Sequence, residues 1–192
     1  LAAENDDEAN YAAEVMAASA RHARRLVQDV LTLAKLHEAS LSRRLIRVED
    51  LIGEVLGELS QAIAESGAAT EVAVGDIEVD CDPIQAERLL ANIVSNALKY
   101  HKPNAVPSIV LRAERDAGEI RLVVADDGIG FAPRHAAEIF SPFRRLHGRA
   151  AHPGTGIGLA IAKTIADLHG WTIEAEAAEM RGATFTIHIP ER

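Results

Sequence analysis

The stretch Gly154-Thr155-Gly156-Ile157-Gly158-Leu159 decides how this chain is interpreted, and it continues directly into residues 160–170. Three glycines at alternate positions allow backbone conformations that other residues avoid. Behind them, Ile157, Ile161 and Ile165 recur at helical spacing, which predicts a helix that follows the loop at once. Backbone N–H groups and the positive end of the helix dipole meet at such a junction. The stretch therefore predicts a phosphate site, although a glycine-rich helix start without a ligand would have the same sequence.

The composition limits the class of protein. With 192 residues, of which 48% are hydrophobic, the chain can bury one core and carry an additional helix. The net charge of −9, without a long basic cluster, argues against a nucleic-acid partner. Cys81 is the only cysteine, which excludes an internal disulfide and fits a reducing compartment, the cytoplasm. No apolar run approaches the roughly 20 residues of a membrane helix. Because the chain begins with Leu1, we expect it to be a cytoplasmic fragment of a larger protein, in which an upstream sensor or membrane segment stays possible.

Residues 9–37 contain no glycine or proline, and their apolar residues follow at steps of three and four. This pattern predicts one long helix with a broad apolar side, after an acidic lead-in at residues 1–8. A single helix would leave that side in water, so we expect it to pair with a second copy or with an upstream helix. The alternative is that it packs only against its own domain. We expect residues 1–43 to be a helical dimerisation unit and residues 44–192 a separate domain.

The rest of the chain alternates between strands and helices. Asp82-Pro83 is a typical helix start, with a capping carboxylate followed by proline. We expect strands at 45–48, 70–74, 77–79, 108–114, 119–125, 172–177 and 184–189, and further helices at 49–67, 82–101, 134–139 and 158–170. These elements predict an α+β fold, a two-layer sandwich of a mixed or antiparallel sheet covered on one face by about three helices.

One face of the helix predicted at 82–101 is polar. Asn92, Asn96 and Lys99 lie four and three residues apart, so they share that face. Amide oxygens are hard ligands suited to Mg²⁺, and a lysine one turn further on would meet the phosphates that such a metal carries. A merely exposed polar face would have the same spacing.

Asp126 ends a predicted buried strand and is followed by Gly128 and Gly130. A carboxylate there could accept a hydrogen bond from an amino group, while the glycines let a flat ring approach the backbone. An Asp-Gly turn without any ligand is about equally consistent with this pattern. The run at residues 140–145 places aromatic residues and arginines before the glycine loop, and it predicts a lid over anionic phosphates.

With these motifs in order, the chain resembles the sensor histidine kinases of two-component systems. Their four ATP-binding boxes match, in order and spacing, Asn92-x-x-x-Asn96-Ala97-x-Lys99-Tyr100, Asp126-x-Gly128-x-Gly130, Ile139-Phe140-x-Pro142-Phe143 and Gly154-Thr155-Gly156-Ile157-Gly158-Leu159. Residues 25–34 resemble the second helix of the kinase dimerisation and phosphotransfer hairpin, so the resemblance covers nearly the whole chain. Residues 143–148 look closest to the phytochrome-like and related soluble-sensor branch.

The resemblance implies a Bergerat-type ATP site. Asp126 would bind the adenine amino group, and Gly128 and Gly130 would shape the pocket. Asn96 would be the main Mg²⁺ ligand, with Asn92 beside it.

The same resemblance assigns the phosphate side. Lys99 and Tyr100 would reach the phosphates and the ribose, and Arg144 or Arg145 would add positive charge. The catalytic set would be Asn92, Lys99 and Arg145. The remaining ATP contacts would be Phe140, Gly154, Thr155, Gly156, Ile157, Gly158, Leu159 and, on the adenine side, Thr184.

The family also implies a reaction. ATP-hydrolysing members of the superfamily have a glutamate at the position of Asn92, and an asparagine cannot act as that base. We therefore expect transfer of the γ-phosphoryl group to a histidine, for relay to an aspartate of a response regulator. None of the eight histidines has the acceptor motif, and His37 departs from it, so we expect the acceptor on an upstream helix. The alternatives are a degraded kinase that acts as a scaffold and a related kinase of serine or dehydrogenase substrates.

Overall fold

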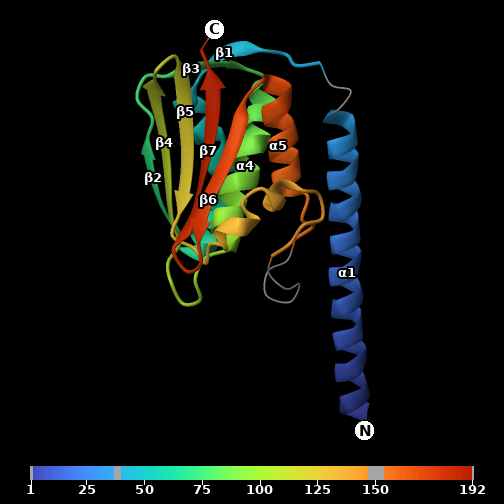
Figure 1. Ribbon diagram of the computed structural model, residues 1–192. Coiled ribbons are helices and arrows are strands. Elements are labelled where there is room, and N and C mark those ends of the chain that lie inside the picture. The colour runs from blue at the N-terminus through green and yellow to red at the C-terminus, as the bar shows by residue number, and fades with distance from the viewer. Residues whose placement is uncertain (1, 37–39, 147–153, 192) are drawn as a thin grey trace.

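The computed structural model describes residues 2–36, 40–146 and 154–191, and Figure 1 shows a long helix beside a sheet that has helices on one face. The helices are α1 (Ala2–Leu36), α2 (Val48–Glu58), α3 (Ser60–Ser66), α4 (Pro83–Lys99) and α5 (Gly158–His169). The strands are β1 (Arg44–Arg47), β2 (Ala69–Ala73), β3 (Glu78–Cys81), β4 (Ser108–Asp116), β5 (Glu119–Asp126), β6 (Thr172–Ala178) and β7 (Gly182–Pro190).

The main sheet has five strands in the order β2-β4-β5-β7-β6. Strand β2 runs parallel to β4, whereas the other neighbouring pairs are antiparallel, so the sheet is mixed. Strands β1 and β3 form a separate antiparallel pair. The predicted fold class is thereby confirmed. The strands predicted at 70–74 and 77–79 exist with shifted ends, as β2 and β3, but they belong to different sheets.

The core lies between the sheet and helices α4 and α5. Alternate residues of β4, β5 and β7 point to the helices because successive side chains of a strand face opposite sides. The buried strand residues include Ile109, Leu111, Ile120, Leu122, Val124, Phe185 and Ile187. Facing them, α4 and α5 bury Leu89, Leu90, Ile93, Ile161 and Ile165.

The sequence sets several element ends through local hydrogen bonds and glycines. The Asp82 carboxylate accepts a hydrogen bond from the Gln85 N–H at 3.2 Å, and Pro83 occupies the first turn of α4, as predicted. Helix α5 ends at Gly170, which adopts the left-handed conformation with φ of 75°. These contacts define where α4 begins and where α5 ends, and residues of both helices line the pocket described below.

Three local predictions were wrong. Residues 2–8 are helical rather than a lead-in, because acidic residues near the positive end of the helix dipole favour a helix start. The helix predicted at 49–67 is interrupted at Leu59, which separates α2 from α3. The helix predicted at 134–139 consists of two short 3₁₀ turns, Pro133–His135 and Glu138–Phe140.

Helix α1 packs against α5 over part of its length. Leu36 is only 2% exposed, whereas Met16 is 72% exposed and Val15, Val27 and Leu31 are also exposed. The apolar side predicted for this helix therefore remains largely uncovered in the single chain. His37, which departs from the acceptor motif, lies outside the described residues, as does Glu38. Within the described part of the chain, no helix has the length and apolar character needed to cross a membrane.

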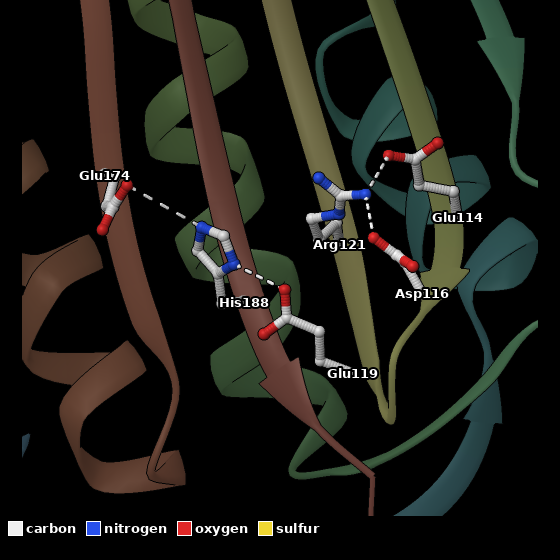
Figure 2. A network of polar contacts seen from close by, with 6 residues as sticks. All are labelled: Glu114, Asp116, Glu119, Arg121, Glu174 and His188. Carbon is white, nitrogen blue, oxygen red and sulfur yellow. Dashed lines mark hydrogen bonds and ion pairs between the residues drawn. The ribbon is translucent and has the colours of Figure 1, made fainter.

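The sheet face that points away from the helices is polar. Figure 2 shows Arg121 between Glu114 and Asp116, at 3.2 and 2.6 Å, and His188 3.1 Å from Glu119. These side chains come from β4, β5, β7 and the ends of those strands, so they join neighbouring strands of the open face. Since this face is occupied by ion pairs between its own residues, the pocket for a ligand has to be sought on the helix side.

Candidate functional site

A pocket opens on the helix side of the sheet, between α4, the end of β5, the turns before the glycine loop and the start of α5. Its two halves share Asn96, Tyr100, Ile139, Arg144 and Leu159. The first half is otherwise lined by Asp126, Gly130, Phe131, Arg145, Leu146, Ala183 and Phe185. The second is otherwise lined by Asp29, Asn92, Ser95, Lys99, Gly154, Thr155, Gly156 and Gly158. We call these the ring half and the loop half.

Asp126 is the polar centre of the ring half. Its Oδ1 atom accepts hydrogen bonds from the N–H groups of Gly128 at 2.8 Å and Ala183 at 3.3 Å. Within the described residues, no group donates a hydrogen bond to Oδ2. Burial raises the pKa of Asp126 above its usual range, although the two N–H groups act in the opposite direction. The site therefore offers one acceptor oxygen in apolar surroundings, which suits a neutral amino donor.

The glycines that follow Asp126 are required by close backbone neighbours. A side chain at Gly130, where φ is 58°, would collide with the carbonyl oxygens of Ala178 and Gly182. A side chain at Gly128 would collide with the Tyr100 carbonyl, which accepts a hydrogen bond from the Ile129 N–H at 2.8 Å. The ring half is thus held by backbone contacts between α4, β5 and β7, and glycine is the residue that fits there.

Apolar side chains complete the ring half. Phe131, Ile139 and Phe185 are each less than 10% exposed and line the pocket. The site predictions did not include Phe131 and Phe185, and they named Ile139 only as part of the third motif, because each looks like an ordinary core residue in the sequence. Their position next to Asp126, and not their type, gives them a role in holding a flat ring.

In the loop half, Asn92, Asn96 and Lys99 line the same side of α4, as their spacing predicted. The Asn92 amide donates to the Arg88 carbonyl at 2.9 Å, which leaves its oxygen toward Gly158. The Lys99 ammonium donates to the Tyr100 hydroxyl at 2.9 Å and lies 4.4 Å from the centre of that ring. Lys99 also lies against Gly154, so one positive charge faces the glycine loop.

The donor set fits a hard divalent ion bound together with phosphates. In the described residues, no cluster of three or more His, Cys, Asp or Glu side chains could hold a metal ion by itself. The amide oxygens of Asn92 and Asn96 border the loop half, and no described group hydrogen-bonds to the Asn96 side chain. Amide oxygens suit Mg²⁺, which usually keeps few protein ligands and takes phosphate oxygens for the others.

The glycine loop closes the loop half. The Arg145 guanidinium donates to the Gly154 carbonyl at 2.6 Å, and fully buried Ile157 anchors the end of the loop in the core. Among the described residues, no side chain caps the start of α5, so its first N–H groups are left for a ligand at the pocket. Because that helix has 12 residues, its dipole favours an anion at this point.

Two further predicted residues have other surroundings than expected. Phe140 packs edge-on against Phe185, with 6.4 Å between ring centres, so it supports the ring half from behind. Thr184 lies between buried Ala183 and Phe185 on β7, and the alternation of the strand turns it to the open face of the sheet. The structure therefore places most of the predicted residues in the walls of the pocket. Gly128, Phe140 and Ile157 lie behind these walls, and Thr184 lies outside the pocket. Arg144 forms an ion pair with Glu138 in the preceding turn.

Comparison with known proteins identifies the family. Residues 81–192 match the histidine kinase-, DNA gyrase B- and HSP90-like ATPases. Cyanobacterial phytochrome A of Nostoc sp. is 36% identical over 173 residues, which cover 86% of this chain and 21% of that protein. The sensor histidine kinase CusS of Escherichia coli O157:H7 is 33% identical over 173 residues, which cover 88% of this chain and 35% of CusS.

A solved structure agrees with these matches. Full-length ShkA in complex with AMPPNP superposes with a TM-score of 0.76 and 29% identity, over 88% of this chain and 36% of ShkA. The chain thus spans between 21% and 36% of the length of these three proteins. It belongs to the histidine kinase-, DNA gyrase B- and HSP90-like ATPase family, with sensor histidine kinases among its relatives, as its four motifs predicted.

Proposed function

We propose that this chain is the ATP-binding part of an autophosphorylating sensor histidine kinase. It binds ATP with Mg²⁺ and transfers the γ-phosphoryl group to a histidine on an upstream helix, for relay to an aspartate of a response regulator. Residues 44–192 form the catalytic domain, and residues 1–43 form the second helix of a dimerisation hairpin. The observation that carries the proposal is the partly buried carboxylate of Asp126, whose second oxygen accepts no hydrogen bond from the described residues, in an apolar pocket that adjoins the start of α5.

Each half of the pocket has a part in this function. The ring half takes adenine, with its amino group donating to Asp126 and its flat faces against Phe131 and Ile139. The loop half takes the triphosphate at the start of α5, with Lys99 supplying positive charge. Asn92 and Asn96 hold Mg²⁺, which supplies neutralisation of negative charge on the phosphates.

In the transfer, a histidine ring nitrogen forms a bond to the γ-phosphorus, and the bond from that phosphorus to the bridging oxygen of ADP breaks. ADP leaves with the electron pair, and the histidine loses its ring proton to solvent. The chain has to position the phosphate and neutralise charge, because the transition state for this transfer is loose. Asn92 supports transfer over hydrolysis, because an amide, unlike a carboxylate, is not basic enough to accept a proton from water.

The binding part of the proposal is tested by calorimetry with Mg-ATP. We expect Asp126→Ala to lose more than about tenfold in affinity, because adenine loses its partly buried hydrogen-bond partner. Asp116→Ala is a matched control, since it removes a carboxylate from the open face shown in Figure 2. If wild type and Asp126→Ala are both without measurable binding, the enzyme proposal fails and a scaffold function replaces it.

The transfer part requires the full-length protein with its upstream helix. Incubation with γ-labelled ATP should give an acid-labile phosphoryl group on a histidine upstream of residue 1. Label on a histidine within residues 1–192, or release of inorganic phosphate without any labelled protein, would contradict the proposed transfer.

A further inference from the structure

Helix α1 reaches the glycine loop through one polar contact. The Thr155 hydroxyl donates a hydrogen bond to the Asp29 carboxylate at 2.5 Å, across 126 positions of the chain. Asp29 also lines the loop half of the pocket, beside Asn92 and Lys99. Asp29 is the only acidic residue among residues 15–36 of α1, so no other carboxylate on this part of the helix could replace it in the contact with Thr155.

The charge of Asp29 conflicts with the ligand proposed for the loop half. In the described residues, no lysine or arginine forms an ion pair with this carboxylate. The nearby cation Lys99 is engaged with Tyr100 at 2.9 Å. A triphosphate entering the loop half would therefore meet an unneutralised negative charge, and like charges in a partly buried pocket repel.

The hydroxyl of Thr155 forms hydrogen bonds both to α1 and to the loop itself. In the structure it donates to Asp29, while the Ile157 N–H donates to it over a longer 3.4 Å. Gly154 and Gly156 flank Thr155, and Gly156 has a φ of 76°, so the backbone on both sides can adopt conformations that are closed to other residues. The loop is thus tied at its most adaptable point to the dimerisation helix.

We propose that Asp29 is a latch that holds the glycine loop on α1 while the loop half is empty, and that binding of a triphosphate releases it. The proposal rests on the proposed function as far as the ligand is concerned. Because coupling between two sites is reciprocal, a movement of α1 that breaks the Asp29–Thr155 bond also raises the affinity for the triphosphate. The latch gives the long helix a direct influence on the ATP site.

The latch itself is tested without nucleotide, by hydrogen exchange of residues 154–158. We expect Asp29→Ala to increase exchange there by about threefold or more, since a local tether limits opening of the loop. Asp29→Asn keeps an acceptor oxygen for Thr155 without the charge, and its exchange should stay close to that of wild type. Unchanged exchange in Asp29→Ala would overturn the latch, whatever the outcome with ATP.

The conflict of charges is tested by the affinities for ATP and adenosine. Asp29→Asn, which loses only the charge, should bind Mg-ATP about fivefold more tightly than wild type, within the usual range of coupling between sites, and Asp29→Ala, which also loses the tether, should bind it more tightly still. Adenosine, which has no phosphates, should bind all three proteins equally. Glu87→Gln is the matched control, because it removes a charge from the groove on the other side of Asp29, outside the loop half.

The possible failures are distinguishable. If wild type binds no ATP, the proposed function fails, while the exchange experiment still decides whether Asp29 restrains the loop. If ATP affinity falls in the Asp29 variants, Asp29 supports the bound nucleotide and the latch is wrong. If ATP affinity is unchanged, or Glu87→Gln raises it equally, the specific conflict of charges is wrong.

Discussion

The ring half and the loop half of the pocket are built in different ways. The ring half is formed by backbone contacts between secondary-structure elements, with a partly buried carboxylate held by two N–H groups. The loop half consists of long side chains and a glycine loop, held by Arg145 on one side and Asp29 on the other. One half is a fixed receptor, and the other can rearrange while the fold stays intact.

We infer from this difference that the ring half selects the base and that the loop half controls the binding of the phosphates. A rigid acceptor can select a base, because a donor displaced by about an ångström from its correct position would lose the hydrogen bond. In the proposed kinase, phosphates would have to be enclosed and released in every turnover, which requires a loop that moves. We therefore expect substitutions in the ring half to affect folding and base selection, and substitutions in the loop half to affect phosphate affinity alone.

The largest effect is expected for alanine substitutions of two glycines, one from each half. Gly130→Ala places a side chain against the Ala178 and Gly182 carbonyls at a positive φ, so we expect a loss of about 2–4 kcal/mol in the free energy of unfolding. Gly158→Ala meets only the Asn92 side chain, whose oxygen would be 2.7 Å away and can move. Its loss should stay below about 1 kcal/mol, while ATP affinity falls.

Urea unfolding of both variants, followed by circular dichroism, measures the comparison. Equal losses of stability, or a larger loss for Gly158→Ala, would mean that the loop half is as rigid as the ring half.

A second, smaller effect concerns the cation of the loop half. Lys99→Met keeps the aliphatic chain and removes the charge, so we expect ATP affinity to fall about tenfold and adenosine affinity to stay the same. Lys163→Met is a matched control on α5, where Lys163 pairs with Asp167 at 2.5 Å on the exposed side. Calorimetry with both ligands checks this, and an equal loss for ATP and adenosine would show that Lys99 acts on the fold of the pocket.

The smallest effect comes from the far end of α5, where His169 is 1% exposed. Its Nε2 atom accepts from the Asp82 N–H at 3.1 Å, which requires the neutral ring, and burial lowers the pKa of His169. The unfolded chain binds the proton more readily, so this contribution to stability is present above the ordinary histidine pKa of about 6.5 and is lost as pH falls toward the lower folded value. Asp126 has the opposite sign: its raised pKa favours the fold at acid pH, and this contribution is lost as pH rises through the folded value.

His169→Gln keeps an acceptor but cannot titrate. We expect it to flatten the decline in unfolding free energy between pH 7 and 5, by at most about 1.4 kcal/mol per pH unit, without changing ATP affinity at neutral pH. Thermal unfolding across this pH range measures the slope. A slope equal to that of wild type would assign the acid sensitivity to other groups.

The fold and most of the pocket could be predicted from the sequence because their signals are local. Two of these signals lie within a single helix. The sequence Asp82-Pro83 predicted where α4 begins, and the spacing of Asn92, Asn96 and Lys99 predicted that they share one side of it; the structure agrees with both. The interruption at Leu59 and the separation of β2 from β3 depend on which distant strands pair, and no local pattern reports that.

The same limit applies within the pocket. Ala183 and Phe185 enter the site only because β5 and β7 pair in a particular register, and Thr184 lies outside it because strand side chains alternate. Asp29 belongs to the motif that indicated the dimerisation helix, but its contact with Thr155 spans 126 residues and became visible only in the structure.

The central claim is that Asp126 selects adenine through a single partly buried acceptor, and Asp126→Asn tests it most directly. Asparagine can keep both internal hydrogen bonds through its oxygen but presents a donor where the free acceptor oxygen was. Calorimetry should compare ATP with purine riboside triphosphate, which lacks the 6-amino group. We predict that wild type prefers ATP by about tenfold or more and that Asp126→Asn has lost this preference while remaining folded. An Asp126→Asn variant that still prefers ATP by the same factor would contradict the account.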